Sequence, residues 1–220
     1  MKPDTPSMQE ISRQLRCPTG DAGQNLAGQM NQSNHGINML CIEKLNTNVP
    51  APHILEIGPG NGGFLPAIFE RFPRANYTGI DWSEDMVNLA RTEQASYVQA
   101  QQAQFQQGEA HQLTFEDDAF DLLLSVNTLY FWPDLIQTLR EFARVLTSEG
   151  QLVLGFGDIA FMQPLPFTAE NFQMYTLETV QTAAREAGFK SLNNTEFKES
   201  VQDDNGQTFY KHYHCLRAKC

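Results

Sequence analysis

A run of glycines directly after a short apolar segment is the feature that most restricts how this chain can fold. Three apolar residues and one carboxylate occupy positions 54–57, and glycine then stands at positions 58, 60, 62 and 63. Glycine lets the backbone turn sharply and approach a ligand closely, because it has no side chain. The N-terminus of a following helix offers unpaired N–H groups to an anionic ligand group. The segment therefore predicts a strand, a tight loop and a helix that bind a nucleotide-type cofactor.

The glycine spacing alone leaves the identity of this cofactor open. Gly58, Gly60 and Gly63 match the G-x-G-x-x-G pattern of dinucleotide-binding loops. Asp81 follows the apolar run 77–80, at the distance where a carboxylate accepts both hydroxyl groups of an adenosine ribose. Because NAD and S-adenosylmethionine both contain such a ribose, these residues fit either cofactor.

The composition argues against several classes of partner. The 220 residues include 26 Asp and Glu against 15 Lys and Arg, a formal charge of -11, and such a surface repels nucleic-acid phosphates and anionic lipids. The four cysteines form no C-x-x-C pair, which indicates reduced thiols in a cytoplasmic protein and no zinc site among them. No apolar run approaches the roughly 18 residues that span a bilayer. We therefore expect a cytoplasmic protein without a nucleic-acid partner or a membrane span.

Apolar segments and helix-like segments alternate from residue 53 onward, which is typical of a mostly parallel sheet with helices on both faces. The expected strands of this part are 53–57, 77–80, 103–107, 120–126 and 151–156. Two last segments, 189–197 and 208–217, follow one another without a helix and predict a closing antiparallel pair. The expected fold class is α/β, with a Rossmann-like, seven-stranded, mostly parallel sheet that contains one antiparallel strand.

The first 47 residues stand apart from this pattern. Residues 1–20 are polar and contain three prolines, so we expect a loosely held arm. Residues 21–47 have apolar positions at helical spacing and predict one or two helices. We therefore divide the chain into an N-terminal arm and helical lid, 1–47, and a cofactor-binding core, 48–220, within a single domain overall.

Four segments of the core occur in a recurrent order and spacing. They are LEIGPGNG at 55–62, GIDWSEDM at 79–86, GEAHQLTF at 108–115 and FDLLLSVN at 120–127. Together they resemble the class I S-adenosylmethionine-dependent methyltransferases, and most closely the methyltransferase type 11 group that includes the ubiquinone and menaquinone methyltransferases. The resemblance covers residues 53–217. It implies S-adenosylmethionine as the cofactor and an N-terminal lid over the site.

The resemblance also implies which loops contact the cofactor. Glu56 would help to hold the ammonium group of the cofactor, and Asp81 would accept its ribose hydroxyl groups. The Glu109 carboxylate would accept a hydrogen bond from the adenine amino group, while the Ala110 N–H would donate to the ring. The cofactor-binding residues expected are Glu56, Gly58, Pro59, Gly60, Gly62, Asp81, Trp82, Met86, Glu109, Ala110 and Asn127.

Aromatic residues after the fourth and fifth strands predict a pocket for the methyl acceptor, because ligands of open α/β folds bind at the carboxyl edge of the sheet. The residues expected there are Tyr130, Trp132, Phe161 and Phe167. Tyr130 is also a candidate catalytic residue, as is His35 in the lid, which would act as a general base. An in-line methyl transfer needs such a base only when the acceptor must lose a proton.

The sequence therefore predicts an enzyme that transfers the methyl group of S-adenosylmethionine to a small, partly apolar molecule by in-line displacement, without a metal ion. Two alternatives stay open at this point. One is an NAD-dependent oxidoreductase, which rests on the glycine spacing. The other is a methyltransferase-like protein that binds its ligand without turnover.

Overall fold

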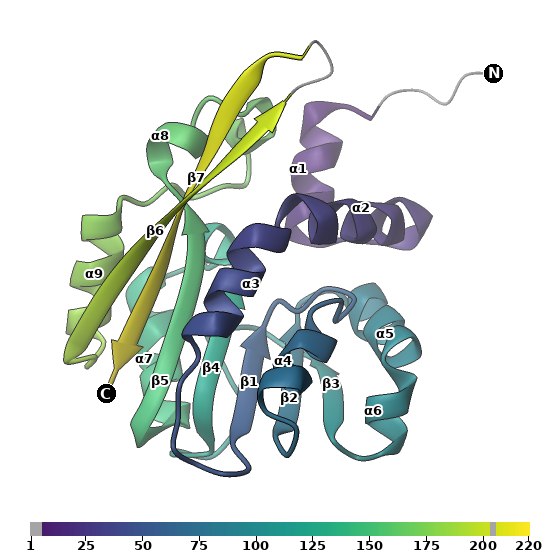
Figure 1. The fold of residues 1–220 in the computed structure, drawn as a ribbon. Helices are drawn as coiled ribbons and strands as arrows, with labels where there is room; N and C mark the ends of the chain where they lie inside the picture. Colours follow the sequence, from purple (N-terminus) through teal and green to yellow (C-terminus); the bar gives the residue numbers. More distant parts are fainter. Residues whose placement is uncertain (1–5, 203–205) are drawn as a thin grey trace.

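One seven-stranded sheet runs through the computed structural model, which describes residues 6–202 and 206–220 (Figure 1). The strand order is β3-β2-β1-β4-β5-β7-β6; the first five strands pair in parallel, and β7 is antiparallel to both of its neighbours. The strands are β1 (His53–Ile57), β2 (Asn76–Asp81), β3 (Ala103–Gln107), β4 (Phe120–Val126), β5 (Leu146–Gly157), β6 (Ser191–Gln202) and β7 (Thr208–Lys219). This topology confirms the predicted fold class.

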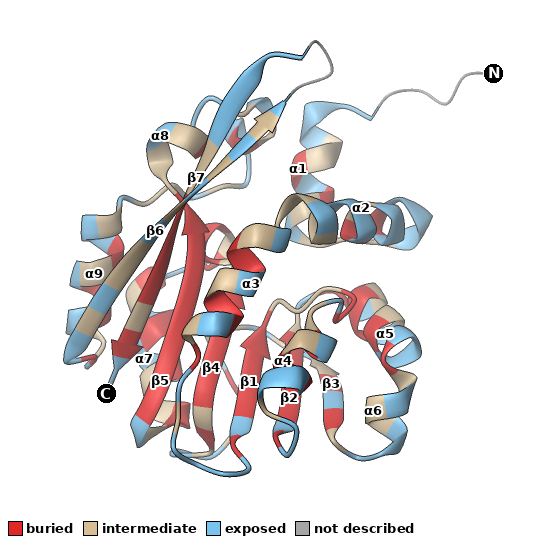
Figure 2. Ribbon diagram, in the orientation of Figure 1, coloured by how far each residue is buried: buried red, intermediate tan, exposed pale blue. Residues whose placement is uncertain are grey.

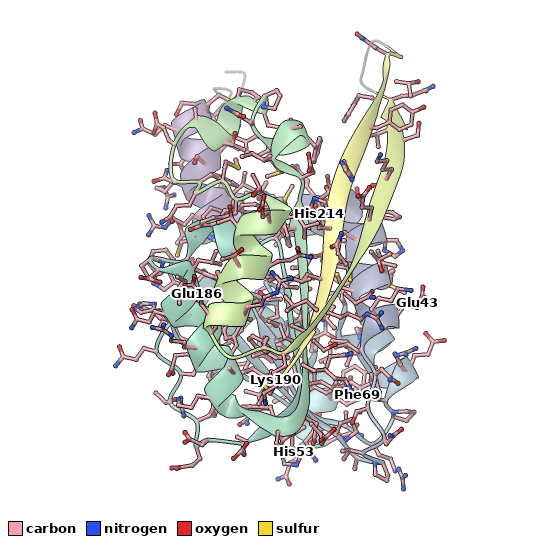
Figure 3. The ribbon with its side chains drawn as sticks, turned by 90° about the vertical axis from the view of Figure 1, so that its left-hand side faces the viewer. Glu43, His53, Phe69, Glu186, Lys190 and His214 are labelled. Atoms are coloured by element: carbon pink, nitrogen blue, oxygen red, sulfur yellow. The ribbon has the colours of Figure 1, made fainter. Side chains whose placement is uncertain are left out.

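Helices cover both faces of the sheet, and Figure 3 shows Glu43 of one helix and Glu186 of another on its opposite sides. The helices of the first face are α3 (His35–Lys44), α4 (Leu65–Arg71), α5 (Glu84–Glu93) and α6 (Ala95–Gln99). Those of the second face are α7 (Leu135–Val145) and α9 (Leu177–Glu186). Each face therefore has its own apolar core, and the central strands between them are buried on both sides (Figure 2).

Local sequence signals explain where several helices begin. The Ser83 hydroxyl accepts a hydrogen bond from the Met86 N–H at 3.2 Å, and the Asp134 carboxylate accepts one from the Gln137 N–H at 2.8 Å. Thr176 caps α9 in the same way through the Thr179 N–H at 3.1 Å. Each cap satisfies an N–H group that has no partner within its helix.

Two helices precede α3 and lie over the carboxyl ends of β1, β2 and β3 (Figure 1). They are α1 (Met8–Arg16) and α2 (Gly20–Ser33). The prediction of a loosely held arm is therefore wrong for the region of α1, whereas residues 1–5 of that arm lie outside the described part of the chain. Ser7 caps α1 by accepting the Glu10 N–H at 3.1 Å, and the Ser12 hydroxyl donates to the Glu170 carbonyl at 2.6 Å. A capped helix with a distant packing partner replaces the expected coil.

Strand β5 and the segment after it also differ from the expectation. The strand begins at Leu146, directly after α7, and the register between β4 and β5 is irregular near Phe120. The segment expected as a loop at 157–167 contains a short helix, α8 (Ile159–Met162), and the beginning of a 3-10 helix, η2 (Pro166–Ala169). Asp158 accounts for α8, because its carboxylate accepts the Ala160 N–H at 2.9 Å. Within the described residues, no helix is both long and apolar enough to cross a membrane.

Candidate functional site

A cavity of about 720 Å³ lies at the carboxyl edge of the parallel strands, beneath α1 and α2. Ten of the eleven predicted cofactor residues line it, and Gly62 is the exception. All four predicted acceptor-pocket residues also line it. The structure thus brings together loops that lie far apart in the sequence, at the position that the fold class predicts.

The glycine loop after β1 forms part of the cavity wall. Gly58 and Gly60 have positive φ angles of 73° and 57°, which side chains disfavour. A Cβ atom at Gly58 would come within 2.3 Å of the Thr128 side chain, whereas one at Gly60 would meet no atom within 4 Å. The Gly60 backbone is therefore open to a ligand. Gly62 instead packs against Gln94 and Phe105, so its expected cofactor contact has no support in the geometry.

Asp81 ends β2 and binds the glycine loop directly. One carboxylate oxygen accepts the Gly60 N–H at 3.0 Å, and the other accepts the Ser83 N–H at 2.9 Å. Burial raises the pKa of Asp81 to about 6, although these N–H donors oppose the shift. The Trp82 N–H also acts on this carboxylate. Because a carboxylate has about four acceptor positions, these three backbone donors leave room for a further hydrogen bond from a ligand.

Glu56 is the most deeply buried carboxylate at the cavity, with an exposed fraction of 6%. The Tyr77 hydroxyl donates to one of its oxygens at 2.7 Å. Burial raises the pKa of Glu56 to about 7, the Tyr77 hydrogen bond opposes this shift, and the Asp81 charge adds to it. Sequence reasoning missed Tyr77, although a tyrosine in a strand buried on both faces requires a partner for its hydroxyl group.

The loop after β3 contributes Glu109, Ala110 and His111 to the cavity wall. The His111 Nε2 lies 3.2 Å from a Glu109 carboxylate oxygen, and the side chain of Glu109 is 55% exposed. On the neighbouring wall, Trp82 is 41% exposed, and the Arg16 guanidinium lies 4.7 Å from the centre of its ring. Arg16 is the last residue of α1 and was not anticipated from the sequence.

Asn127 and Tyr130 hold the end of β4 against the end of β5. The Tyr130 hydroxyl accepts the Gly157 N–H at 2.6 Å and lies 3.3 Å from the Asn127 side-chain oxygen, to which it donates. Asn127 itself has a positive φ of 57°. Burial holds the pKa of Tyr130 well above its usual value. The neutral Tyr130 hydroxyl thus already donates one hydrogen bond and accepts another. This arrangement suits a residue that holds other groups in position better than the catalytic proton transfer considered for Tyr130.

Helix α2 contacts the glycine loop through an asparagine side chain, and the expected histidine makes no such contact. The Asn31 amide donates to the Asn61 side-chain oxygen at 2.9 Å, and Asn31 and Asn34 both line the cavity. His35, the candidate base, is exposed at the beginning of α3, and its ring lies 6.0 Å from that of Phe64. It is not among the described residues that line the cavity. The geometry therefore gives no support to His35 as a base.

Aromatic rings fill the other end of the cavity. Phe172 contacts both Phe131 and Phe167, with ring centres 4.7 and 5.9 Å apart. Phe161 meets Tyr213 of β7 edge to face at 5.6 Å. The sequence analysis identified part of this wall but missed Phe172 and Tyr213. Tyr213 lies on β7, whose position depends on how the last strands pair, and Phe172 lies in the connection between η2 and α9.

One lysine reaches this aromatic end from β7. The Lys211 ammonium donates to the Ser33 carbonyl at 2.7 Å and to the Ser33 hydroxyl at 3.0 Å. Its side chain is 12% exposed and lies 3.9 Å from a Glu199 carboxylate oxygen. Because Ser33 is the last residue of α2, Lys211 binds the carboxyl end of that helix, where the helix dipole favours a cation.

Comparison with known proteins gives this geometry a family context. Residues 55–154 match a family described as methyltransferase domain. The chain is 30% identical over 161 residues to the O-methyltransferase cnsE of Penicillium expansum, across 68% of this chain and 56% of that protein. It is 34% identical over 103 residues to the fatty-acid O-methyltransferase of Mycolicibacterium smegmatis, across 47% of this chain and 36% of that protein. The chain thus spans only about a third to a half of these relatives.

The fold of the chain is also similar to that of a solved structure. The YcgJ protein from Bacillus subtilis superimposes with a TM-score of 0.71, covering 84% of this chain and 98% of that one at 19% identity. This likeness shows the fold. The family match places a methyltransferase domain at residues 55–154, and the two relatives are similar to this chain over part of their length. They give no support to the oxidoreductase alternative.

Proposed function

Residues 55–154 of this chain belong to the methyltransferase domain family, and from that premise we propose that the protein transfers the methyl group of S-adenosylmethionine to an oxygen atom of a small, partly apolar molecule. One observation supports the proposal above all others. A single cavity joins a polar end, with Glu56, Asp81 and Glu109, to an end lined by aromatic rings. Oxygen is the proposed target because both relatives described above are O-methyltransferases.

The residues at the polar end fit the cofactor. Gly60 leaves open space where a side chain would stand, and the Asp81 carboxylate beside it binds the Gly60 and Ser83 N–H groups and lines the cavity. We assign the ribose hydroxyl groups to Asp81, the ammonium group to Glu56 and the adenine ring to Glu109 and Ala110. When bound, S-adenosylmethionine supplies a methyl group on a positively charged sulfur.

The aromatic end would hold the acceptor and exclude water. Positive charge disperses as the methyl group leaves sulfur, so a dry, aromatic-lined space favours the transition state over the ground state. Tyr130 holds the ends of β4 and β5 together at the junction of the two halves, and this rigidity supports in-line alignment of the reacting atoms.

We further propose that α1, α2 and α3 act as a lid over this cavity, within the predicted segment 1–47. Three hydrogen bonds between this N-terminal segment and the core support this assignment. The Ser83 hydroxyl donates to the Pro18 carbonyl, the Gly20 N–H donates to the Asp85 carboxylate at 2.7 Å, and Asn31 binds Asn61. The lid therefore touches both loops that would hold the cofactor.

The acidic surface and the thiols support a small-molecule partner in the cytoplasm and argue against a nucleic acid. The formal charge of -11 would repel phosphate backbones. Cys41 and Cys215 are buried as free thiols with their sulfur atoms 3.5 Å apart. Such a pair is typical of a reducing compartment.

Calorimetric titration with S-adenosylhomocysteine, with NAD as the control, tests the cofactor. We expect saturable binding of the first compound and none of the second. Binding of NAD alone would overturn the proposal. Incubation with methyl-labelled S-adenosylmethionine and a panel of small apolar carboxylic acids and phenols, followed by mass spectrometry, then tests the target atom. Cofactor binding with transfer only to nitrogen or carbon would contradict the oxygen assignment, and binding without transfer to any acceptor would favour a non-catalytic role.

A further inference from the structure

A cluster of two histidines and two carboxylates lies on the face of β7 that points away from the cavity. Side chains alternate along a strand, so Lys211 and Tyr213 line the cavity while His212 and His214 project from the opposite face. Glu196 of β6 pairs directly with His214 in the strand register, and Asp158 follows β5. Figure 3 labels His214 in this part of β7. We call these four residues, Asp158, Glu196, His212 and His214, the histidine–carboxylate cluster.

Their donor atoms converge closely. One ligand atom from each of Glu196, His212 and His214 lies within 4.8 Å of the other two. The His212 Nε2 is 3.3 Å from a Glu196 oxygen, and the His214 Nε2 is 3.1 Å from an Asp158 oxygen. Ligands around a tetrahedral Zn²⁺ are about 3.3 Å apart, given metal–ligand distances of about 2.0–2.1 Å. The Glu196, His212 and His214 side chains are therefore close enough to share one ion, and Asp158, which lies 3.9 Å from His212 and 3.1 Å from His214, is placed to be a fourth ligand.

From this convergence we propose that the histidine–carboxylate cluster binds a divalent transition-metal ion, best Zn²⁺, through two imidazoles and two carboxylates. Imidazole and carboxylate ligands suit Zn²⁺ and related ions. The site is distinct from the reaction site, for which the sequence predicted no metal.

A neighbouring amide supplies independent support. The Asn194 side-chain nitrogen lies 3.2 Å from the His214 Nδ1, while the Asn194 side-chain oxygen is buried without a hydrogen-bond partner. Rotating this amide by 180° would give that oxygen the Nδ1–H of His214 as a donor. The Nε2 would then carry a lone pair toward Asp158. Histidines that bind metals usually donate their other ring N–H to such an acceptor, so one rotation satisfies the buried oxygen and prepares the ligand.

The position of the site indicates a structural role. Asp158 also caps α8, whose residues Phe161 and Met162 line the aromatic end of the cavity. A bound ion would tie the beginning of α8 to β6 and β7. Metal binding should therefore raise the melting temperature of the protein and stiffen this wall without contacting the acceptor.

Titration of the chelator-treated full chain with Zn²⁺ by calorimetry tests the proposal. We expect one equivalent to bind and the affinity to fall at least about tenfold in His212→Gln and in Glu196→Gln, whose side chains are not fully buried. The matched controls are His53→Gln and Glu199→Gln, the latter on the other face of β6, and both should bind as the wild type does. Asn194→Ala should weaken binding by about tenfold through loss of the His214 partner.

Co²⁺ absorption distinguishes this site from one made by thiols. Nitrogen and oxygen ligands in a tetrahedral site give visible absorption without the near-ultraviolet thiolate charge-transfer band that cysteine ligands produce. The proposal is overturned if no single equivalent binds, if His212→Gln and Glu196→Gln bind Zn²⁺ as tightly as the wild type, or if the thiolate band appears. None of these measurements depends on methyl transfer, so the proposed function and the metal site can fail separately.

Discussion

The two ends of the cavity are built in different ways. The polar end consists of loops that directly follow β1, β2, β3 and β4, and the pairing of those strands places Glu56, Asp81 and Glu109. The aromatic end is assembled from residues 130–132, from the segment 157–172 and from β7, with α1 and α2 above it. The first construction depends on strand order alone, whereas the second depends on the register of an antiparallel strand. The polar end should therefore determine cofactor binding, and the aromatic end should determine which acceptor is used.

Removal of Asp81 should have the largest effect on the polar end. We expect Asp81→Ala to lower the affinity for S-adenosylhomocysteine by about a hundredfold, because two hydrogen bonds to a charged group are lost. Calorimetry on the folded variant checks this. Asp121→Ala is a matched control, since Asp121 also accepts a backbone N–H, that of His53 at 2.8 Å, at the other end of the sheet. Unchanged affinity in a folded Asp81→Ala protein would contradict the assignment.

We expect Glu56→Gln to lower the affinity for S-adenosylhomocysteine by about tenfold, which is less than for Asp81→Ala. We also expect the substitution to change how this affinity depends on pH. The pKa of Glu56 is raised to about 7, so its negative charge is lost as the pH falls through 7. Wild-type affinity should therefore decline below pH 7, whereas the variant should decline only nearer pH 6, where Asp81 takes up its proton. Titrations between pH 5.5 and 8.5 compare the two proteins, and identical profiles would rule out Glu56 as the titrating group.

The same residue predicts a stability effect in the cofactor-free protein. Burial raises the folded-state pKa of Glu56 above its ordinary value, so the folded protein binds this proton more tightly than the unfolded chain. The resulting stabilisation is complete at low pH and is lost as the pH rises through about 7. Glu56→Gln keeps an acceptor for the Tyr77 hydroxyl and buries no charge. The melting temperature of Glu56→Gln, measured by circular dichroism, should therefore exceed that of the wild type at pH 8 but not at pH 5. A lower melting temperature than the wild type at pH 8 would instead show that the folded protein stabilises Glu56 as a carboxylate.

The different construction of the polar and aromatic ends also explains which residues of the site could be predicted from the sequence. The polar residues were predictable because each stands at, or within two residues of, the carboxyl end of a strand, in a contiguous motif. Gly62 was the exception, since its position in the turn places it toward Gln94 and Phe105 and away from the cavity. The partnership of Tyr77 with Glu56 required the register in which Ile54 lies opposite Tyr77. Motifs give the order of such loops but not which side chains meet across strands.

The aromatic end could be predicted only in part, because the sequence does not determine the register in which β7 pairs with β5. A one-residue shift in the pairing of β7 would turn Lys211 and Tyr213 out of the cavity and His212 and His214 into it. The alternating sequence of the strand permits both arrangements, and the pairing with β5 decides between them. Helix α1 presents a similar difficulty, because Ser12 acquires its partner, the Glu170 carbonyl, only when α1 packs near η2, whereas the Ser7 cap is local to the helix.

A change at the aromatic end should affect the acceptor and leave the cofactor alone. We expect Phe172→Ala to raise the KM for the acceptor by about tenfold, because one aromatic wall with its apolar area is removed. The dissociation constant of S-adenosylhomocysteine should not change. Phe115→Ala removes a ring of equal size that packs on Phe120, with ring centres 4.9 Å apart, outside the cavity. A rise in KM in both variants would mean that general loss of packing, and not acceptor contact, is responsible.

The smallest effect is expected where the lid meets β7. Lys211→Met removes the donor to the Ser33 carbonyl and hydroxyl while keeping an apolar side chain of similar length. Two charge-assisted bonds at a largely covered position contribute about 1 kcal/mol in net terms, so kcat/KM for the acceptor should fall several-fold. Lys198→Met is the matched control, because Lys198 lies on β6 two residues from Glu196 and shares the face that points away from the cavity. Hydrogen exchange should quicken in the last turn of α2 in Lys211→Met alone. If exchange quickens but kcat/KM does not fall, α2 is held by Lys211 without acting as a lid, and the acceptor end is determined by the aromatic wall alone.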